Sequence, residues 1–333
     1  MAEIVLGIGA SHTPLLTLES PQWSHRAAAD YANTRLNLSD GRWLDYPALL
    51  AEVGPRYADV VTPEHLERKA LLCEAALDRL ADALEIVAPD AVVVVGDDQG
   101  ELFSPANQPA VAIFHGDAIR MSDMYGQDHT PAWMRQVGEG YLMDATHSLP
   151  GHPALAAELI AGLMERGVDL ATVASVEAPG KVGFGHAFGF IAKRLFRGRA
   201  IPMVPLLLNT YFPPNVPTAA RCHDIGRLLA QVLRAGTSPL RVAVIASGGL
   251  SHFVVDEALD RRVIDAFVSG NAEALRSIPR AALNSGSSEI LNWVLAAGAL
   301  QGLPLRWHDY QPLYRTPAGT GIGAAFCEWR HPT

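Results

Sequence analysis

The sequence has few cysteines and no long hydrophobic run. Only three of its 333 residues are cysteines, Cys73, Cys222 and Cys327, and none forms a CxxC pair. Their number and spacing exclude a disulfide framework and a cysteine-built zinc site, and they fit a reducing cytoplasm. The apolar runs are short, such as Ala91 to Val95 and Met203 to Leu208. A membrane helix needs about 20 apolar residues, so we expect no membrane span.

Positive charge is also scarce. Lysine and arginine total 26 against 35 aspartates and glutamates, which gives a formal net charge of −9 and a pI near 5.7. A nucleic-acid-binding protein would need a basic face, so this class is excluded. No basic segment precedes the first apolar run, so we expect no secretory signal and a cytoplasmic location. With 49% hydrophobic residues the chain can fold around a full core.

Short apolar runs alternate with segments of helical period through most of the chain. Strands are expected at 4–8, 91–95, 111–114, 170–176, 203–208 and 241–246, with a weak closing strand at 323–327. Helices are expected at 63–87, 153–167, 183–196 and 219–235, with two or three more before the closing strand. This alternation predicts an α/β fold with a mostly parallel central sheet and helices on both faces. One domain over residues 1–333 is the simplest organisation.

Residues 17–62 have no clear period and are rich in polar and aromatic side chains. The aromatic residues of this stretch are Trp23, Tyr31, Trp43, Tyr46 and Tyr57. That is too many for a linker, so we interpret the segment as an ordered insertion or lid within the domain. Since aromatics are enriched in pockets and interface cores, the insertion either covers a pocket or forms a dimer contact.

Polar residues follow several of the expected strands directly, where α/β sheets bind ligands. They are His12 after the first strand, Gln99 after Asp97 and Asp98, and His252 after the strand at 241–246. His186 lies in a glycine-flanked loop before a helix, and Glu289 opens another helix after a serine-rich turn. Each has an ordinary structural alternative, such as a helix-capping glutamate at 289 or a turn at Asp97 and Asp98. Together they favour a functional site.

Histidine and carboxylate ligands with free coordination positions suit a divalent metal ion. Two histidines and one carboxylate are the ligand set of non-heme Fe(II) oxygenases, which leave positions for substrate and O₂. Further histidines at such a site can transfer protons.

Several segments in the same order identify a family resemblance. The sequence resembles the class III (LigB-type) extradiol ring-cleavage dioxygenases at Gly9-Ala10-Ser11-His12-Thr13-Pro14, Gly183-Phe184-Gly185-His186, Ser247-Gly248-Gly249-Leu250-Ser251-His252, Gly286-Ser287-Ser288-Glu289-Ile290 with Trp293, and Ala318-Gly319-Thr320-Gly321-Ile322-Gly323. The insertion after the first strand is most similar to the 3-O-methylgallate and gallate dioxygenase branch. The resemblance implies a LigB-like α/β fold over most of the chain.

The resemblance also implies site residues and partners. His12 and Glu289 would be iron ligands, His252 the base that acts on the substrate hydroxyl, and His186 a second acid/base histidine. The cofactor would be Fe(II), the partners a small catecholic aromatic acid of gallate, methylgallate or protocatechuate type and O₂, and the assembly a homodimer. Both atoms of O₂ would enter the product.

One position departs from the family pattern. Where a second metal histidine is expected after the second strand, this sequence has Gln99. Gln99 ligates the metal weakly or lies beside a water, or another histidine, His115 or His129, reaches the site. Otherwise iron is not bound, and the chain is an iron-free binding protein or a zinc-dependent hydrolytic variant.

A substrate carboxylate needs a cationic or hydroxyl partner. Four residues are candidates for this contact: Asn209, Tyr211, Tyr314 and Arg315. The alternative for each is packing in a surface or loop.

Overall fold

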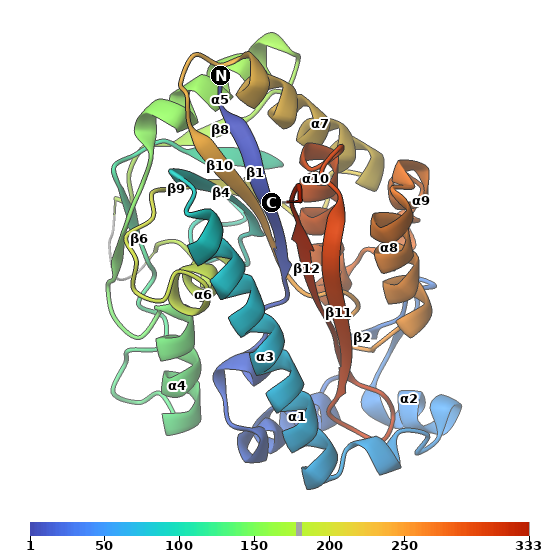
Figure 1. The fold of residues 1–333 in the computed structure, drawn as a ribbon. Helices are drawn as coiled ribbons and strands as arrows, with labels where there is room; N and C mark the ends of the chain where they lie inside the picture. Colours follow the sequence, from blue (N-terminus) through green and yellow to red (C-terminus); the bar gives the residue numbers. More distant parts are fainter. Residues whose placement is uncertain (178–181, 333) are drawn as a thin grey trace.

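The computed structural model describes residues 1–177 and 182–332, and its centre is one eight-stranded sheet (Figure 1). The strand order across the sheet is β11-β12-β1-β10-β4-β9-β5-β8. The strands are β1 (Glu3–Ala10), β4 (Ala91–Asp97), β5 (Val111–Phe114), β8 (Ala171–Val173), β9 (Met203–Leu208), β10 (Arg241–Ser247), β11 (Leu305–Tyr314) and β12 (Gly321–Trp329). Two short ribbons lie outside it: β2 (Leu36–Asn37) with β3 (Trp43–Leu44), and β6 (Ala118–Arg120) with β7 (Ser148–Pro150).

The centre of the sheet is parallel, as predicted. β1, β10, β4 and β9 run in the same direction, and Ile245 of β10 pairs with Ile8 on one side and Val94 on the other. β12 joins β1 antiparallel, and β5 joins β9 antiparallel. Since neighbouring parallel strands end at the same edge, the residues that follow β1, β10 and β4 lie close together.

Helices cover both faces of the sheet, which confirms the predicted fold class. One face carries α5 (Pro153–Glu165), α7 (Ala219–Ala235), α8 (Glu257–Ser269), α9 (Ala272–Arg276) and α10 (Ile290–Ala299), and the other carries α3 (Pro63–Val87), α4 (Ala132–Tyr141) and α6 (His186–Arg194). The insertion holds α1 (Ser24–Tyr31) and α2 (Tyr46–Val53). None of the helices in the described part of the chain combines the length and apolar composition needed to cross a bilayer.

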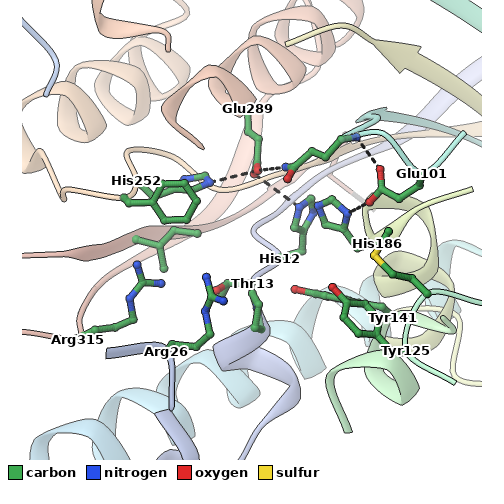
Figure 2. Close-up of a pocket in the computed structure, with 15 residues that line it drawn as sticks. His12, Thr13, Arg26, Glu101, Tyr125, Tyr141, His186, His252, Glu289 and Arg315 are labelled. Atoms are coloured by element: carbon green, nitrogen blue, oxygen red, sulfur yellow. Dashed lines mark hydrogen bonds and ion pairs between the residues drawn. The ribbon is translucent and has the colours of Figure 1, made fainter. Parts of the chain in front are cut away.

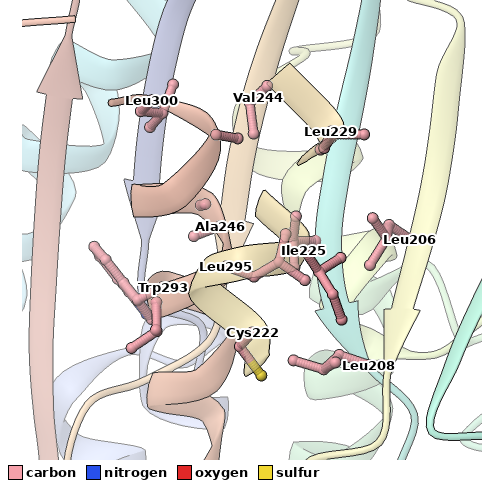
Figure 3. Packing of buried hydrophobic residues seen from close by; sticks show 14 of the residues in the cluster. Leu206, Leu208, Cys222, Ile225, Leu229, Val244, Ala246, Trp293, Leu295 and Leu300 are labelled. Atoms are coloured by element: carbon pink, nitrogen blue, oxygen red, sulfur yellow. The ribbon is translucent and has the colours of Figure 1, made fainter. Parts of the chain in front are cut away.

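Alternating residues of β4 divide between two hydrophobic cores. Val93 and Val95 pack with α7 and α10, whereas Val92 and Val94 pack with α3 and α6. This explains the continuous valine run, because a strand buried on both faces has no polar side. Figure 3 shows the first core, where α7 and α10 pack against β10 and β9 and bury the Cys222 side chain.

Several predicted elements agree with the structure closely, and others do not. The helix at 63–87 begins at Pro63 with Thr62 as its cap, whose hydroxyl accepts the His65 N–H. The weak closing strand was underestimated: β12 covers nine residues, all buried, and pairs with the unpredicted β11. The region 116–150 also contains α4 and two short strands.

The glycines of β1 permit close packing of α10. A Cβ at Gly9 would overlap the Trp293 ring, whereas a Cβ at Gly7 would meet the side-chain end of Leu300. The Trp293 ring is buried and held by a hydrogen bond from its Nε1 to the carbonyl oxygen of Gly248 (2.7 Å).

We therefore expect Gly9→Ala to lower the free energy of unfolding by about 2–3 kcal/mol, in the range for an overpacked core. Gly7→Ala should cost less, because the leucine end can change rotamer while the indole is fixed. Denaturant unfolding of both variants measures the difference. An equal or larger loss for Gly7→Ala would contradict this account.

Candidate active site

The five residues that the sequence predicts for metal binding or proton transfer lie around one pocket of about 250 Å³ (Figure 2). They come from different elements: β1 is followed by His12, β4 by Gln99 and β10 by His252, while His186 opens α6 and Glu289 precedes α10. The fold thus brings together side chains from the whole length of the chain.

The hydrogen bonds of His12 fix its tautomer. The Ser247 hydroxyl donates to the carbonyl oxygen of Ala187 (2.6 Å), so its oxygen accepts the Nδ1–H of His12 (3.0 Å). The Nε2 atom of His12 therefore carries a lone pair, is buried and has no hydrogen-bond partner in the described residues. Burial lowers the pKa of His12 to about 3, so the ring is neutral. This atom is ready to bind a cation.

His186 is held in a similar way by a carboxylate. Its Nδ1 lies 2.5 Å from Oε1 of Glu101, whose other oxygen accepts the backbone N–H of Gln99 (2.6 Å). Burial lowers the pKa of His186, but the charge and hydrogen bond of Glu101 outweigh it and raise the pKa to about 9. A histidine that donates Nδ1–H to a carboxylate presents its Nε2 to a metal in many metal sites.

Glu289 lies at the centre of the cluster and does not cap its helix. Its Oε2 accepts the backbone N–H of Gly249 (2.6 Å), and its Oε1 lies 3.2 Å from Nε2 of His252. Its Oε2 is 3.6 Å from Nε2 of His12, with no hydrogen bond between them. Burial raises the pKa of Glu289, but the charge of His252 outweighs this effect and lowers the pKa to about 2. The carboxylate is therefore ionised.

His12, His186 and Glu289 together form a candidate metal site. One ligand atom from each lies within 4.8 Å of the others. The bare lone pair of His12 beside an ionised carboxylate indicates that a cation belongs between them, because two acceptors otherwise repel each other. Two imidazoles and one carboxylate form the set that leaves free positions on a non-heme iron.

The Gln99 side chain forms hydrogen bonds with two carboxylates of the site. Its amide nitrogen donates to Oδ2 of Asp97 (3.0 Å) and to Oε1 of Glu289 (3.1 Å). Since both neighbours are carboxylates, the nitrogen and not the oxygen must face them. Gln99 thus contacts Glu289 through its amide nitrogen, and His186 is a further residue that could supply a ligand atom. The alternatives His115 and His129 do not line this pocket.

His252 is positioned for proton transfer at one atom. Its Nδ1–H donates to the carbonyl oxygen of Leu250 (2.8 Å), so only Nε2 exchanges protons with the pocket. Its ring packs against Gly286, where a Cβ would overlap it. Burial lowers the pKa of His252, but Glu289 outweighs it and the pKa is raised.

Of the four candidate substrate contacts, only Arg315 lines the pocket. Asn209 donates to the Phe212 carbonyl oxygen and to Asn215, in a turn after β9. Tyr211 bonds Ser285 (3.3 Å), and the Tyr314 hydroxyl donates to Glu257 (2.7 Å). These three side chains are thus engaged elsewhere.

Four titratable residues of the pocket were not found by sequence reasoning: Arg26, Glu101, Tyr125 and Tyr141. Glu101 follows Gln99 by two positions, and its place shortly after a buried strand could have indicated that it belongs to the site. The other three lie in the insertion and in the region 116–150, where the sequence shows no regular period.

The insertion is attached to the site loops by buried polar groups. The Asn37 amide nitrogen donates to the carbonyl oxygen of His252 (3.3 Å), and its oxygen accepts the N–H of Phe253 (3.1 Å). Asp30 forms a buried two-pronged ion pair with Arg315 (2.6 and 3.1 Å). These contacts place α1 on the rim of the pocket.

Comparison with known proteins gives two findings. The family model described as the catalytic LigB subunit of aromatic ring-opening dioxygenase matches residues 48–323. Gallate dioxygenase from Pseudomonas putida KT2440 is 28% identical over 140 residues, which are 39% of this chain and 40% of that protein. The alignment thus covers less than half the length of that relative.

Proposed function

Since the chain belongs to the LigB family of aromatic ring-opening dioxygenases, we propose that it is a non-heme Fe(II)-dependent extradiol dioxygenase. Its substrate is a single-ring catecholic acid of gallate, 3-O-methylgallate or protocatechuate type. The observation that carries the proposal is the buried Nε2 of His12, which lies beside the ionised Glu289 and has no hydrogen-bond partner among the residues that the structure describes. The similarity to gallate dioxygenase supports the substrate class.

The metal ligands in this proposal are His12, His186 and Glu289. Ser247 and Glu101 each hold the Nδ1 of one histidine and so aim both Nε2 atoms at the same place. Gln99 and the N–H of Gly249 hold the carboxylate. Fe(II), when bound there, supplies a Lewis acid that acidifies catechol hydroxyls and the redox chemistry that O₂ requires.

His252 accepts the substrate proton in this proposal. Since its Nδ1–H stays on the Leu250 carbonyl, the incoming proton binds at Nε2, where Glu289 stabilises the charged ring. The site also excludes water, because His12 and Glu289 are only 3% and 2% exposed. Both atoms of O₂ end in the ring-opened product, so no external reductant is consumed.

Two further expectations belong to the same proposal, one from the composition of the insertion and one from the family resemblance. Residues 17–62 act as a lid on the catalytic domain, supported by the contacts of Asn37 and Asp30 with the site loops. A homodimeric assembly is proposed from the family resemblance alone.

Oxygen consumption after metal reconstitution tests the proposal. The protein is loaded anaerobically with Fe(II) or, as a control, with Zn(II), and mixed with gallate, 3-O-methylgallate or protocatechuate in an oxygen electrode. We expect one O₂ per substrate and a new ring-cleavage chromophore with iron only. Turnover without O₂ would indicate the zinc-dependent hydrolytic alternative. Failure to bind iron would leave an iron-free binding protein as the better description.

A further inference from the structure

One arginine side chain of the pocket has a buried nitrogen without a hydrogen-bond partner among the described residues. Arg26 of α1 lines the pocket, and its Nε is buried without a hydrogen-bond partner in the part of the chain that the structure describes. A buried donor without a partner costs free energy, and the cost is larger when the group is charged. Arg26 therefore lacks an acceptor for its Nε–H among the described residues, and a ligand could supply one.

The second cation of the pocket is already paired. Arg315 is buried and donates two hydrogen bonds to Asp30. Asp30 lies four positions after Arg26 on the same helix, where an ion pair between them would be possible. Its oxygens instead accept from Arg315 and from the Thr320 hydroxyl (2.8 Å). Asp30 thus neutralises Arg315, and none of the residues that the structure describes forms an ion pair with Arg26.

A second donor without a partner lies in the same pocket. The Tyr141 hydroxyl is buried and has no hydrogen-bond partner in the described residues, and its ring lies 5.5 Å from that of His186. Figure 2 shows Arg26, Tyr141 and Tyr125 on the side of the pocket away from Glu289. A ligand that fills the pocket must bring acceptor oxygens to this side.

We propose that Arg26 binds the carboxylate of an aromatic substrate and is a specificity-determining residue for single-ring aromatic acids. The inference rests on the proposed function, since the ring hydroxyls must face the metal ligands for the carboxylate to reach Arg26. A guanidinium matches a carboxylate through two parallel hydrogen bonds, which a neutral substituent does not provide. The volume of about 250 Å³ suits one substituted ring.

Equilibrium binding tests the inference independently of turnover. Dissociation constants for protocatechuate and for its neutral isostere 3,4-dihydroxybenzamide are measured anaerobically, with and without Fe(II). Arg26→Gln should raise the Kd of protocatechuate roughly 10- to 100-fold, as for a lost hydrogen bond to a charged group, and change that of the amide by less than about threefold. Arg35→Gln is the matched control, because Arg35 is an exposed arginine of the insertion that stacks over Trp43.

The outcomes separate this inference from the proposed function. Retained amide binding shows that the Arg26→Gln pocket is folded, so a selective loss of acid binding supports the inference even if no substrate consumes O₂. If Arg26→Gln leaves the ratio of the protocatechuate Kd to the amide Kd as in the wild type, the inference is overturned, even in an active dioxygenase. Failure of the wild-type protein to bind protocatechuate, or an equal loss for both ligands, would also overturn it.

Discussion

Replacing Glu289 with glutamine should reduce iron affinity by more than about 100-fold, beyond the 10- to 100-fold loss seen when only a hydrogen-bond partner of a ligand is removed. Glutamine has the same shape and can still accept the Gly249 N–H, so the fold should persist. It lacks the negative charge that faces His12 and His186 in the buried site. Iron content after anaerobic loading and dialysis measures the effect, and O₂ uptake should fall with it.

Gln99→Ala is the matched control for this variant. It removes one donor to Glu289 and leaves all three proposed ligands in place. If Gln99 only orients the carboxylate, iron affinity falls by no more than about 10- to 100-fold. A loss as large as that of Glu289→Gln would place Gln99 among the ligands and contradict the assignment of His186. Denaturant unfolding shows whether either variant loses metal merely by unfolding.

The position of most site residues could be predicted from the sequence because parallel strands end at one edge. His12 and His252 follow β1 and β10, which are neighbours in the sheet, and Gln99 follows β4 beside them. Buried strands are recognisable by composition alone, so the residues after them are recognisable too. The edge strand β11 was missed because its half-exposed residues show no continuous apolar run.

The roles at the site were harder to predict than the positions. Gln99 donates to Glu289 across 190 residues of sequence, and this contact decides which end of its amide faces the two carboxylates of Asp97 and Glu289. Tyr314 and Arg315 are adjacent, yet the Tyr314 hydroxyl bonds Glu257 while Arg315 lines the pocket. The role of each side chain thus depends on the hydrogen-bond partners that tertiary packing brings to it, and a local sequence pattern does not predict these partners.

Arg26 shows a further limit of sequence reasoning. An arginine in an aperiodic polar segment resembles a surface residue, and the composition gives no reason to separate it from Arg35. Only the packing of α1 on the pocket rim, with Asp30 already paired to Arg315, shows that Arg26 is available to a ligand.

Replacing His252 with asparagine should lower kcat about 10²- to 10⁴-fold, the usual contribution of a positioned general base. The asparagine amide can donate to the Leu250 carbonyl as Nδ1–H does, so the loop is preserved while the proton acceptor Nε2 is removed. Iron content should not change, because His252 lies outside the proposed ligand set.

Iron content and kcat, measured on the same variant, distinguish a general base from a metal ligand. For Glu289→Gln both should fall together, whereas for His252→Asn only kcat should fall, with KM and iron content near wild type. His223→Asn is the control, since His223 is also a buried histidine but lies on α7, outside this pocket. Loss of iron in His252→Asn would assign His252 to the metal, and unchanged kcat would remove it from proton transfer. Because Nε2 of His252 lies 3.2 Å from the carboxylate that also faces His12, only these paired measurements separate the two roles.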